Sequence, residues 1–323
     1  MSEWIGSIEC HKCIYLGEYD DKTDDKKRYM LAMLTRCREN CISLKRNNIK
    51  YKIKIVLTAN RKKVEILSES PSTIDAMSSI IHEILRFENL FEGLFFPLVS
   101  FTADETNYTR EIQQKQLDYY QSQKQYAYIP IAFEDQQYRK LYMKWLRVEK
   151  KNKIIHPVFL YSAYLEGMPV DIRMALLLET FEPIAQDLNN RGIITLVKPP
   201  TRTFTNRCKY CGKPVSRTVR NRELEFKDKL QPLIKKYGKT IFKGDAKTKL
   251  ITRSVKIRNK VDHVNANTEN AMNGKQCGFY IYKFTLMYRY IILQEIGVED
   301  KNINPYIAEW VESFNEKYPQ LRV

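Results

Sequence analysis

FYIYKFTLMYRYIIL, residues 279–293, is apolar on nearly every side when it is wound into a helix. A surface helix of a globular protein is apolar along one stripe only, so this segment indicates a helix that other elements enclose. It is either the central core helix of a helical domain or part of an interface between subunits. Apolar residues also recur with helical spacing on both sides of it, at about residues 169–190, 219–237, 247–265 and 305–317. The C-terminal half is therefore predicted to be all-α.

The N-terminal half shows strand patterns as well as helical ones. Apolar side chains alternate with lysines in residues 50–58, and the alternation resumes in residues 62–67 after a short polar turn, which predicts a β-hairpin. Helical spacing predicts one helix between Lys26 and Leu44 and a second that begins at Ser70-Pro71. This half is predicted to be mixed α and β.

These patterns predict two domains that meet near the charged stretch at residues 147–153. Residues 1–152 would form a mixed α/β domain of sensing or regulatory role, and residues 153–323 an all-α helical bundle. A chain of 323 residues is long enough for two domains of ordinary size. The expected fold class is α+β followed by all-α, and mainly α overall.

Composition and cysteine usage narrow the class of protein further. No apolar run approaches the roughly 18 to 20 residues that a membrane span needs, and residues 1–6 lack the pattern of a secretion signal. The seven cysteines are an odd number and few for this length, which fits reduced thiols or metal ligands better than a disulfide framework. We expect a globular, cytoplasmic protein.

Positive charge is concentrated in one block of the chain. The net charge is +16, and residues 201–260 alone hold 19 Lys and Arg against 4 Asp and Glu, a net charge of +15. A single charge run is usually a solvated surface, but a block that holds nearly all of the excess charge indicates a phosphate-binding surface. Nucleic acid is the expected partner.

The sequence RNKVDH, residues 258–263, lies where this block ends. In the predicted helix, Ile257 and the two following valines fall on one side, whereas Arg258, Asn259 and His263 fall on the other. Asn259 and His263 are four residues apart and therefore stack one turn over another. A guanidinium, an amide and an imidazole are presented together.

These groups suit metal-independent cleavage of RNA by its own 2′-hydroxyl. The reaction needs a proton removed from the 2′-oxygen, a proton given to the 5′-oxygen, and charge stabilised on phosphorus. His263 is suited to the proton steps near neutral pH, Arg258 to a doubly hydrogen-bonded phosphate, and Asn259 to orienting His263 or a phosphate oxygen. Further RNA contacts on the same helix are expected from Arg253, Lys256 and Lys260.

One helix offers one such histidine, whereas the reaction needs both a base and an acid. A two-fold dimer would appose two copies of the helix and supply both, so a homodimer is predicted. The spacing of Arg258 and His263 is weak support by itself. The alternative is an ion pair between Arg258 and Asp262, four residues apart, with His263 solvated on a basic helix. Asn259 beside the arginine and the surrounding charge favour the catalytic interpretation.

At these residues the sequence resembles the HEPN superfamily, whose nuclease members carry an Arg, usually followed by a polar residue, and a His after a spacer of four to six. Arg258, Asn259 and His263 fit this pattern, and the resemblance covers about residues 155–320. It implies an all-α, commonly dimeric, metal-independent endoribonuclease of toxin and antiviral defence systems. Within the superfamily the chain looks most like the ApeA-type abortive-infection proteins, on its two-part architecture and a likeness around residues 82–101.

A second motif, Cys208-Lys209-Tyr210-Cys211-Gly212, has the form of a zinc knuckle. A closed structural zinc site needs four ligands, and the other Cys-x2-Cys pair is Cys10 and Cys13. Either the two pairs share one structural zinc, or Cys208 and Cys211 are free or redox-active thiols. No cofactor is expected for catalysis.

Two other functions stay open at this point. The chain could be a non-catalytic nucleic-acid-binding protein, in which the basic block and the knuckle hold the ligand and Arg258 and His263 only contact phosphate. It could also be the helical partner of a toxin-antitoxin pair, inactive without a second chain. His82 and His156 are most simply structural histidines.

Overall fold

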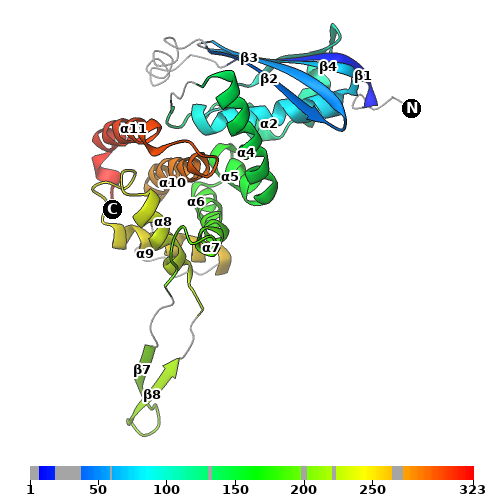
Figure 1. The fold of residues 1–323 in the computed structure, drawn as a ribbon. Coiled ribbons are helices and arrows are strands. Elements are labelled where there is room, and N and C mark those ends of the chain that lie inside the picture. The colour runs from blue at the N-terminus through cyan, green and yellow to red at the C-terminus, as the bar shows by residue number, and fades with distance from the viewer. Residues whose placement is uncertain are drawn as a thin grey trace. The chain divides into compact units, whose positions relative to one another are not determined.

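The structure of the chain is a computed structural model that describes residues 7–18, 38–58, 60–129, 133–197, 202–219, 223–263 and 272–323 (Figure 1). Within these ranges, the side chains of residues 202–204, 217–219 and 260–263 lie outside the description. The chain divides into two compact units: unit 1 is Met1–Met168 with Tyr288–Ser313, and unit 2 is Pro169–Met287 with Phe314–Val323. The division into functional domains at residues 152 and 153 stays a prediction, because compactness does not show which part works alone.

Unit 1 is built on an antiparallel sheet with the order β2-β3-β4-β1-β5-β6 among the described strands. In β3 the side chains of Tyr51, Ile53 and Ile55 are buried and the lysines between them are exposed, as a sheet with one buried face requires. The antiparallel pairing of β3 with β4 confirms the predicted hairpin. The strands are β1 (Glu9–Glu18), β2 (Arg38–Arg46), β3 (Ile49–Leu57), β4 (Arg61–Thr73), β5 (Leu98–Ala103) and β6 (Thr106–Asn107).

Helix α2 (Ile74–Glu92) packs against β1 and β4 (Figure 1). The hydroxyl of Thr73 caps its start by accepting a hydrogen bond from the Ala76 amide at 3.2 Å. The predicted start at Ser70-Pro71 is therefore wrong, because pairing with β1 keeps the end of β4 extended through Thr73. Gly93 ends the helix with a φ of 69°, and a side chain there would come within 2.8 Å of backbone carbonyls.

Strand β2 corrects the prediction of a helix between Lys26 and Leu44. Residues 26–37 lie outside the described residues, but the remainder pairs with β3 along its whole length. Burial in β2 alternates with a period of two, at Asn40, Ile42 and Leu44. The buried Asn40 amide donates to the Phe133 carbonyl oxygen at 3.1 Å, so a polar residue occupies a position that a strand pattern reserves for an apolar one.

The remaining elements are mostly helical, which confirms the predicted fold class of an α+β region followed by a helical one. Unit 1 also holds α3 (Thr109–Lys115), α4 (Asp135–Lys151), α5 (Ile155–Tyr164) and most of α11 (Asn304–Lys317). Unit 2 holds α6 (Val170–Glu179), α7 (Phe181–Asn190), α8 (Phe226–Tyr237), α9 (Lys247–His263) and the first part of α10 (Gly274–Glu295). The sequence did not predict the small hairpin of β7 (Arg202–Arg207) with β8 (Pro214–Val219) in unit 2.

Helix α10 is the enclosed helix that its sequence predicts. Residues 279–293 are buried, apart from the half-buried Tyr282, so α10 is a core helix within a single chain. The two cations in residues 279–293 are both compensated: Lys283 pairs with Asp245 at 2.6 Å, and Arg289 donates to three backbone carbonyl oxygens at 2.6 to 3.0 Å. Even so, neither α10 nor any other helix in the described ranges is long and apolar enough to cross a membrane.

Candidate functional site

Helix α9 carries the three residues predicted to do the chemistry. Leu250, Ser254 and Ile257 are buried on one side of it, where α9 packs against α6 and α8. Arg258 and Asn259 follow on the half-exposed side. The backbone stays helical through His263, whose side chain lies outside the described part of the chain. The helix therefore places Arg258, Asn259 and His263 on one continuous element.

The junction of α6 and α7 faces this part of α9. Pro183, in the first turn of α7, has no amide hydrogen to donate to the Glu179 carbonyl, which weakens helical hydrogen bonding at this point. The single helix predicted at about residues 169–190 is divided here into two helices at Thr180, whose hydroxyl donates to the Leu177 carbonyl oxygen at 2.6 Å. The break leaves the carboxylates of Glu179 and Glu182 on either side of the junction.

The guanidinium of Arg258 is held between these carboxylates and an aromatic ring. Its Nε–H donates to Glu179, and its Nη2 lies 3.3 Å from an oxygen of Glu179 and 3.3 Å from one of Glu182. The Cζ atom lies 5.4 Å from the centroid of the Phe226 ring, a cation–π distance. Lys229 forms an ion pair with Glu182. With two cations and two carboxylates, the position of Arg258 is fixed and its charge is compensated.

These two carboxylates are site residues that sequence reasoning missed. They lie 79 and 76 residues before Arg258 in the chain, beyond the reach of any helical spacing. The available signal was Pro183, which follows Glu182 directly and lies four residues after Glu179. The ion pair of Arg258 with Asp262, which the structural alternative requires, involves a side chain outside the described residues.

The residues predicted to contact RNA lie along the same helix. Arg253 is half-exposed, and its Nη1 lies 3.5 Å from the side-chain oxygen of Gln276. Lys256 is exposed, and the side chain of Lys260 lies outside the described residues. The described members thus face solvent at least in part, which leaves them accessible to a polyanion.

The predicted knuckle forms the turn between β7 and β8. The Cys208 amide donates to the Lys213 carbonyl oxygen at 2.8 Å, and the Gly212 amide to the Cys208 carbonyl oxygen at 2.9 Å. Gly212 has a φ of 69°, which favours glycine. Amides of Tyr210 and Cys211 point at the Cys208 sulfur and lower the pKa of its thiol. A thiol poised in this way is suited to binding a metal.

The other pair, Cys10 and Cys13, lies on β1 with its sulfurs 3.5 Å apart. Residues three apart on a strand normally point to opposite faces, but a bulge after Cys10 turns both thiols inward, where they are buried. In the described part of the chain, no group of three or more His, Cys, Asp or Glu side chains is arranged to hold a metal ion. Because the two pairs belong to different units, a zinc site shared by all four cysteines stays a prediction.

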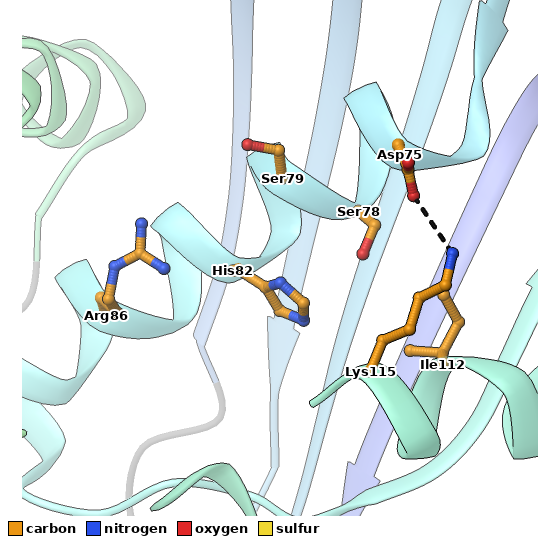
Figure 2. A pocket seen from close by; sticks show the side chains of 7 residues that line it. All are labelled: Asp75, Ser78, Ser79, His82, Arg86, Ile112 and Lys115. Carbon is orange, nitrogen blue, oxygen red and sulfur yellow. Dashed lines mark ion pairs between the residues drawn. The ribbon is translucent and has the colours of Figure 1, made fainter. Parts of the chain in front are cut away.

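A cavity of about 240 Å³ lies in unit 1 between α2 and α3 (Figure 2). Both of its cations have carboxylate partners, since Lys115 lies 3.6 Å from Asp75 and Arg86 pairs with Glu149. Burial, with a smaller effect of Arg86, lowers the pKa of His82 to about 4, so this imidazole is neutral at neutral pH. The lining is thus polar but electrically compensated, unlike the basic block of unit 2. The lining residues are Asp75, Ser78, Ser79, His82, Arg86, Ile112 and Lys115.

Comparison with known families agrees with the motif on α9. Residues 203–302 match the family described as Apea-like HEPN. The matched segment runs from the β7–β8 hairpin through α8, α9 and α10, and it contains Arg258, Asn259 and His263. This match supports the resemblance of the segment to the HEPN superfamily and, within it, to the ApeA type. No curated protein and no solved structure matches the chain.

Proposed function

We propose that this protein is a metal-independent endoribonuclease whose reacting groups are Arg258, Asn259 and His263. HEPN domains are generally nucleases, and this one indicates a function of the ribonuclease or abortive-infection type. The observation that carries the proposal is the unbroken helix α9, which bears all three residues within the matched segment. The net charge of +15 in residues 201–260 supports a polyanionic substrate.

The proposed reaction is attack of the RNA 2′-oxygen on the neighbouring phosphorus. A neutral His263 removes the 2′-hydroxyl proton while the bond from phosphorus to the 5′-oxygen breaks, and an imidazolium gives a proton to that leaving oxygen. Arg258 neutralises charge on the phosphoryl oxygens. The products are one RNA end with a 2′,3′-cyclic phosphate and one with a 5′-hydroxyl, and no metal takes part.

The proposed site is composite, with one His263 from each of two copies. HEPN proteins typically act as dimers on RNA, and a two-fold axis next to α9 would supply the base from one copy and the acid from the other. Light scattering should give a mass of twice 38.3 kDa under the conditions of cleavage. A monomer that cuts RNA at full rate would overturn the composite site.

In the cell, we propose that cleavage serves antiviral defence as a toxin or abortive-infection effector, with unit 1 as the sensing or regulatory part. The Apea-like match supports this role. Expression of the wild type should arrest growth or protect a culture from phage, and Arg258→Ala should do neither. Protection that survives in the Arg258→Ala variant would separate the defence role from the proposed site.

Incubation of the purified protein with total RNA tests the enzymatic proposal. Wild type should produce discrete fragments with and without EDTA, and His263→Ala should produce none. Salt-dependent RNA binding without fragments from the wild type would favour the non-catalytic binding protein instead. Activity that appears only with a co-purified second chain would favour the toxin-antitoxin partner.

A structural zinc at Cys208 and Cys211 is a separate proposal, supported by the knuckle turn and by the lowered pKa of Cys208. Metal analysis of the purified protein should find zinc, and a Cys208→Ser/Cys211→Ser variant should lose it. If Cys10 and Cys13 complete the site, Cys10→Ser/Cys13→Ser should lose the same zinc. Retention of zinc in that second variant would show that the pairs do not share one ion.

A further inference from the structure

The β7–β8 hairpin is basic and exposed on every described side. Residues 202–219 contain five Lys and Arg and no Asp or Glu. Residues 205–216 are exposed apart from the half-buried Cys208, so no other part of unit 2 covers this segment. A two-stranded hairpin with so little apolar burial gains almost nothing from a core of its own. The basic composition of the hairpin is therefore better explained by binding to a partner than by a contribution to the stability of the fold.

The tip of the hairpin carries an aromatic ring in water. Tyr210 is 100% exposed, more than any other large hydrophobic side chain in the described residues. The knuckle turn fixes the backbone around it through the hydrogen bond from the Cys208 amide to the Lys213 carbonyl oxygen. A ring held at such a tip offers its flat face to a base, because base–aromatic stacking needs only an accessible π-surface.

Three cations lie within three residues of Tyr210 in the chain, and they differ from Arg258 in their pairing. Arg207, Lys209 and Lys213 are exposed, and none forms an ion pair with any side chain in the described part of the protein. Arg258, in contrast, is compensated by two carboxylates. Phosphates that approach the hairpin tip would thus meet positive charge and no competing carboxylate.

We propose that the β7–β8 hairpin is a binding arm for single-stranded RNA, with Tyr210 stacking on an unpaired base and the three cations on the phosphates beside it. Double-stranded RNA fits less well, because its bases are stacked inside and its deep major groove excludes side chains. The proposal deepens the proposed function, on which it rests for RNA as the polyanion. It assigns to the arm the capture of substrate, separate from the reacting groups on α9.

Binding is measured in a His263→Ala background, so that RNA stays intact during the experiment. Fluorescence anisotropy with a labelled single-stranded oligoribonucleotide should show that Tyr210→Ala weakens binding by at least about fivefold. Tyr210→Trp should restore it, because the ring face and not the hydroxyl makes the contact. Tyr306→Ala, which removes a partly exposed tyrosine of α11, is the matched control and should bind as tightly as the parent.

The salt dependence of the same binding tests the cations. Lys209→Gln and Lys213→Gln should each lower the slope of log affinity against log salt by about 0.7, the value for one phosphate contact on a single strand. Lys140→Gln, which removes an exposed lysine of α4, should leave the slope unchanged. Equal slopes for all three variants would overturn the role of the hairpin cations.

The outcomes separate the arm from the nuclease. With His263 intact, Tyr210→Ala should raise KM for single-stranded RNA and leave kcat unchanged, because the ring does not touch the reacting phosphate. Unchanged binding and KM in Tyr210→Ala, or tighter binding of a duplex of the same composition, would overturn the arm while the nuclease stands. Tyr210-dependent binding by a wild type that never cuts RNA would support the arm and overturn the nuclease.

Discussion

The guanidinium of Arg258 and the carboxylate of Glu179 form a two-point ion pair that joins α9 to the end of α6 in unit 2. The Arg258 side chain is 24% exposed, so solvent reaches the pair and screening limits its strength. Any RNA phosphate that binds this guanidinium must share it with Glu179 or displace Glu179. The pair thus holds the arginine in place and at the same time opposes the approach of an anion.

Glu179→Gln should therefore tighten RNA binding. Removing one negative charge next to Arg258 is expected to lower KM by about two- to fivefold at low salt, with the gain shrinking as salt rises. Asp187→Asn is the matched control, because it removes the same charge from α7, where Asp187 pairs with Arg191. If both variants changed KM equally, the effect would reflect total charge and the specific competition at Arg258 would be refuted.

Removing one partner of the buried pair of Lys283 and Asp245 should lower the free energy of unfolding strongly, whereas replacing both with apolar residues should lower it much less. Both side chains are fully buried, and the Tyr280 hydroxyl also donates to Asp245 at 3.0 Å. Asp245→Leu should destabilise the protein by about 3 to 5 kcal/mol, because it strands a buried ammonium. The double variant Asp245→Leu/Lys283→Met should recover much of this loss in urea unfolding. Additive losses would show that the two charges do not compensate each other.

Acid should destabilise unit 1 through its buried histidines. Burial lowers the pKa of His156 to about 3, whereas an unfolded histidine has a pKa near 6.5. Between these values the unfolded chain binds a proton that the folded chain does not, so stability falls as the pH drops, by up to about 1.4 kcal/mol per pH unit. Urea unfolding from pH 7 to pH 4 should show this dependence.

His156→Gln should reduce the slope of the unfolding free energy against pH by the contribution of one proton. His82→Gln should remove a similar contribution that ends nearer pH 4, where the lowered pKa of His82 lies. The free energy of unfolding at pH 7 serves as the control. His156 also hydrogen-bonds to Tyr288 at 3.1 Å, and losing this bond lowers stability by the same amount at every pH. An unchanged slope in both variants would mean that acid acts through other groups.

Local patterns were enough to predict the elements whose burial is simple. Residues 279–293 indicated an enclosed helix because no side of them is polar, and α10 is that helix. For residues 38–44 the prediction of a helix was wrong, because the spacing of Cys41 and Leu44 fits a helix as well as a strand. The deciding feature, the bond from the buried Asn40 to Phe133, joins residues 93 apart and leaves no trace in local periodicity.

The candidate site divides in the same way. Arg258, Asn259 and His263 could be picked out because they lie on one short segment with a family-like spacing. Glu179 and Glu182 could not, because they meet Arg258 only through the packing of α6 and α7 on other helices. The exposed Tyr210 was visible in sequence as part of the knuckle, but its full exposure is a property of the hairpin, which sequence did not predict.

The ends of the RNA fragments test the central claim most directly. Purified protein is incubated with RNA in EDTA, and the new 3′ ends are analysed for wild type and for His263→Ala. The proposed chemistry predicts 2′,3′-cyclic phosphates from the wild type and no new ends from the variant. Ends with a 3′-hydroxyl, which indicate a metal-activated water, or cleavage that persists in His263→Ala, would contradict it.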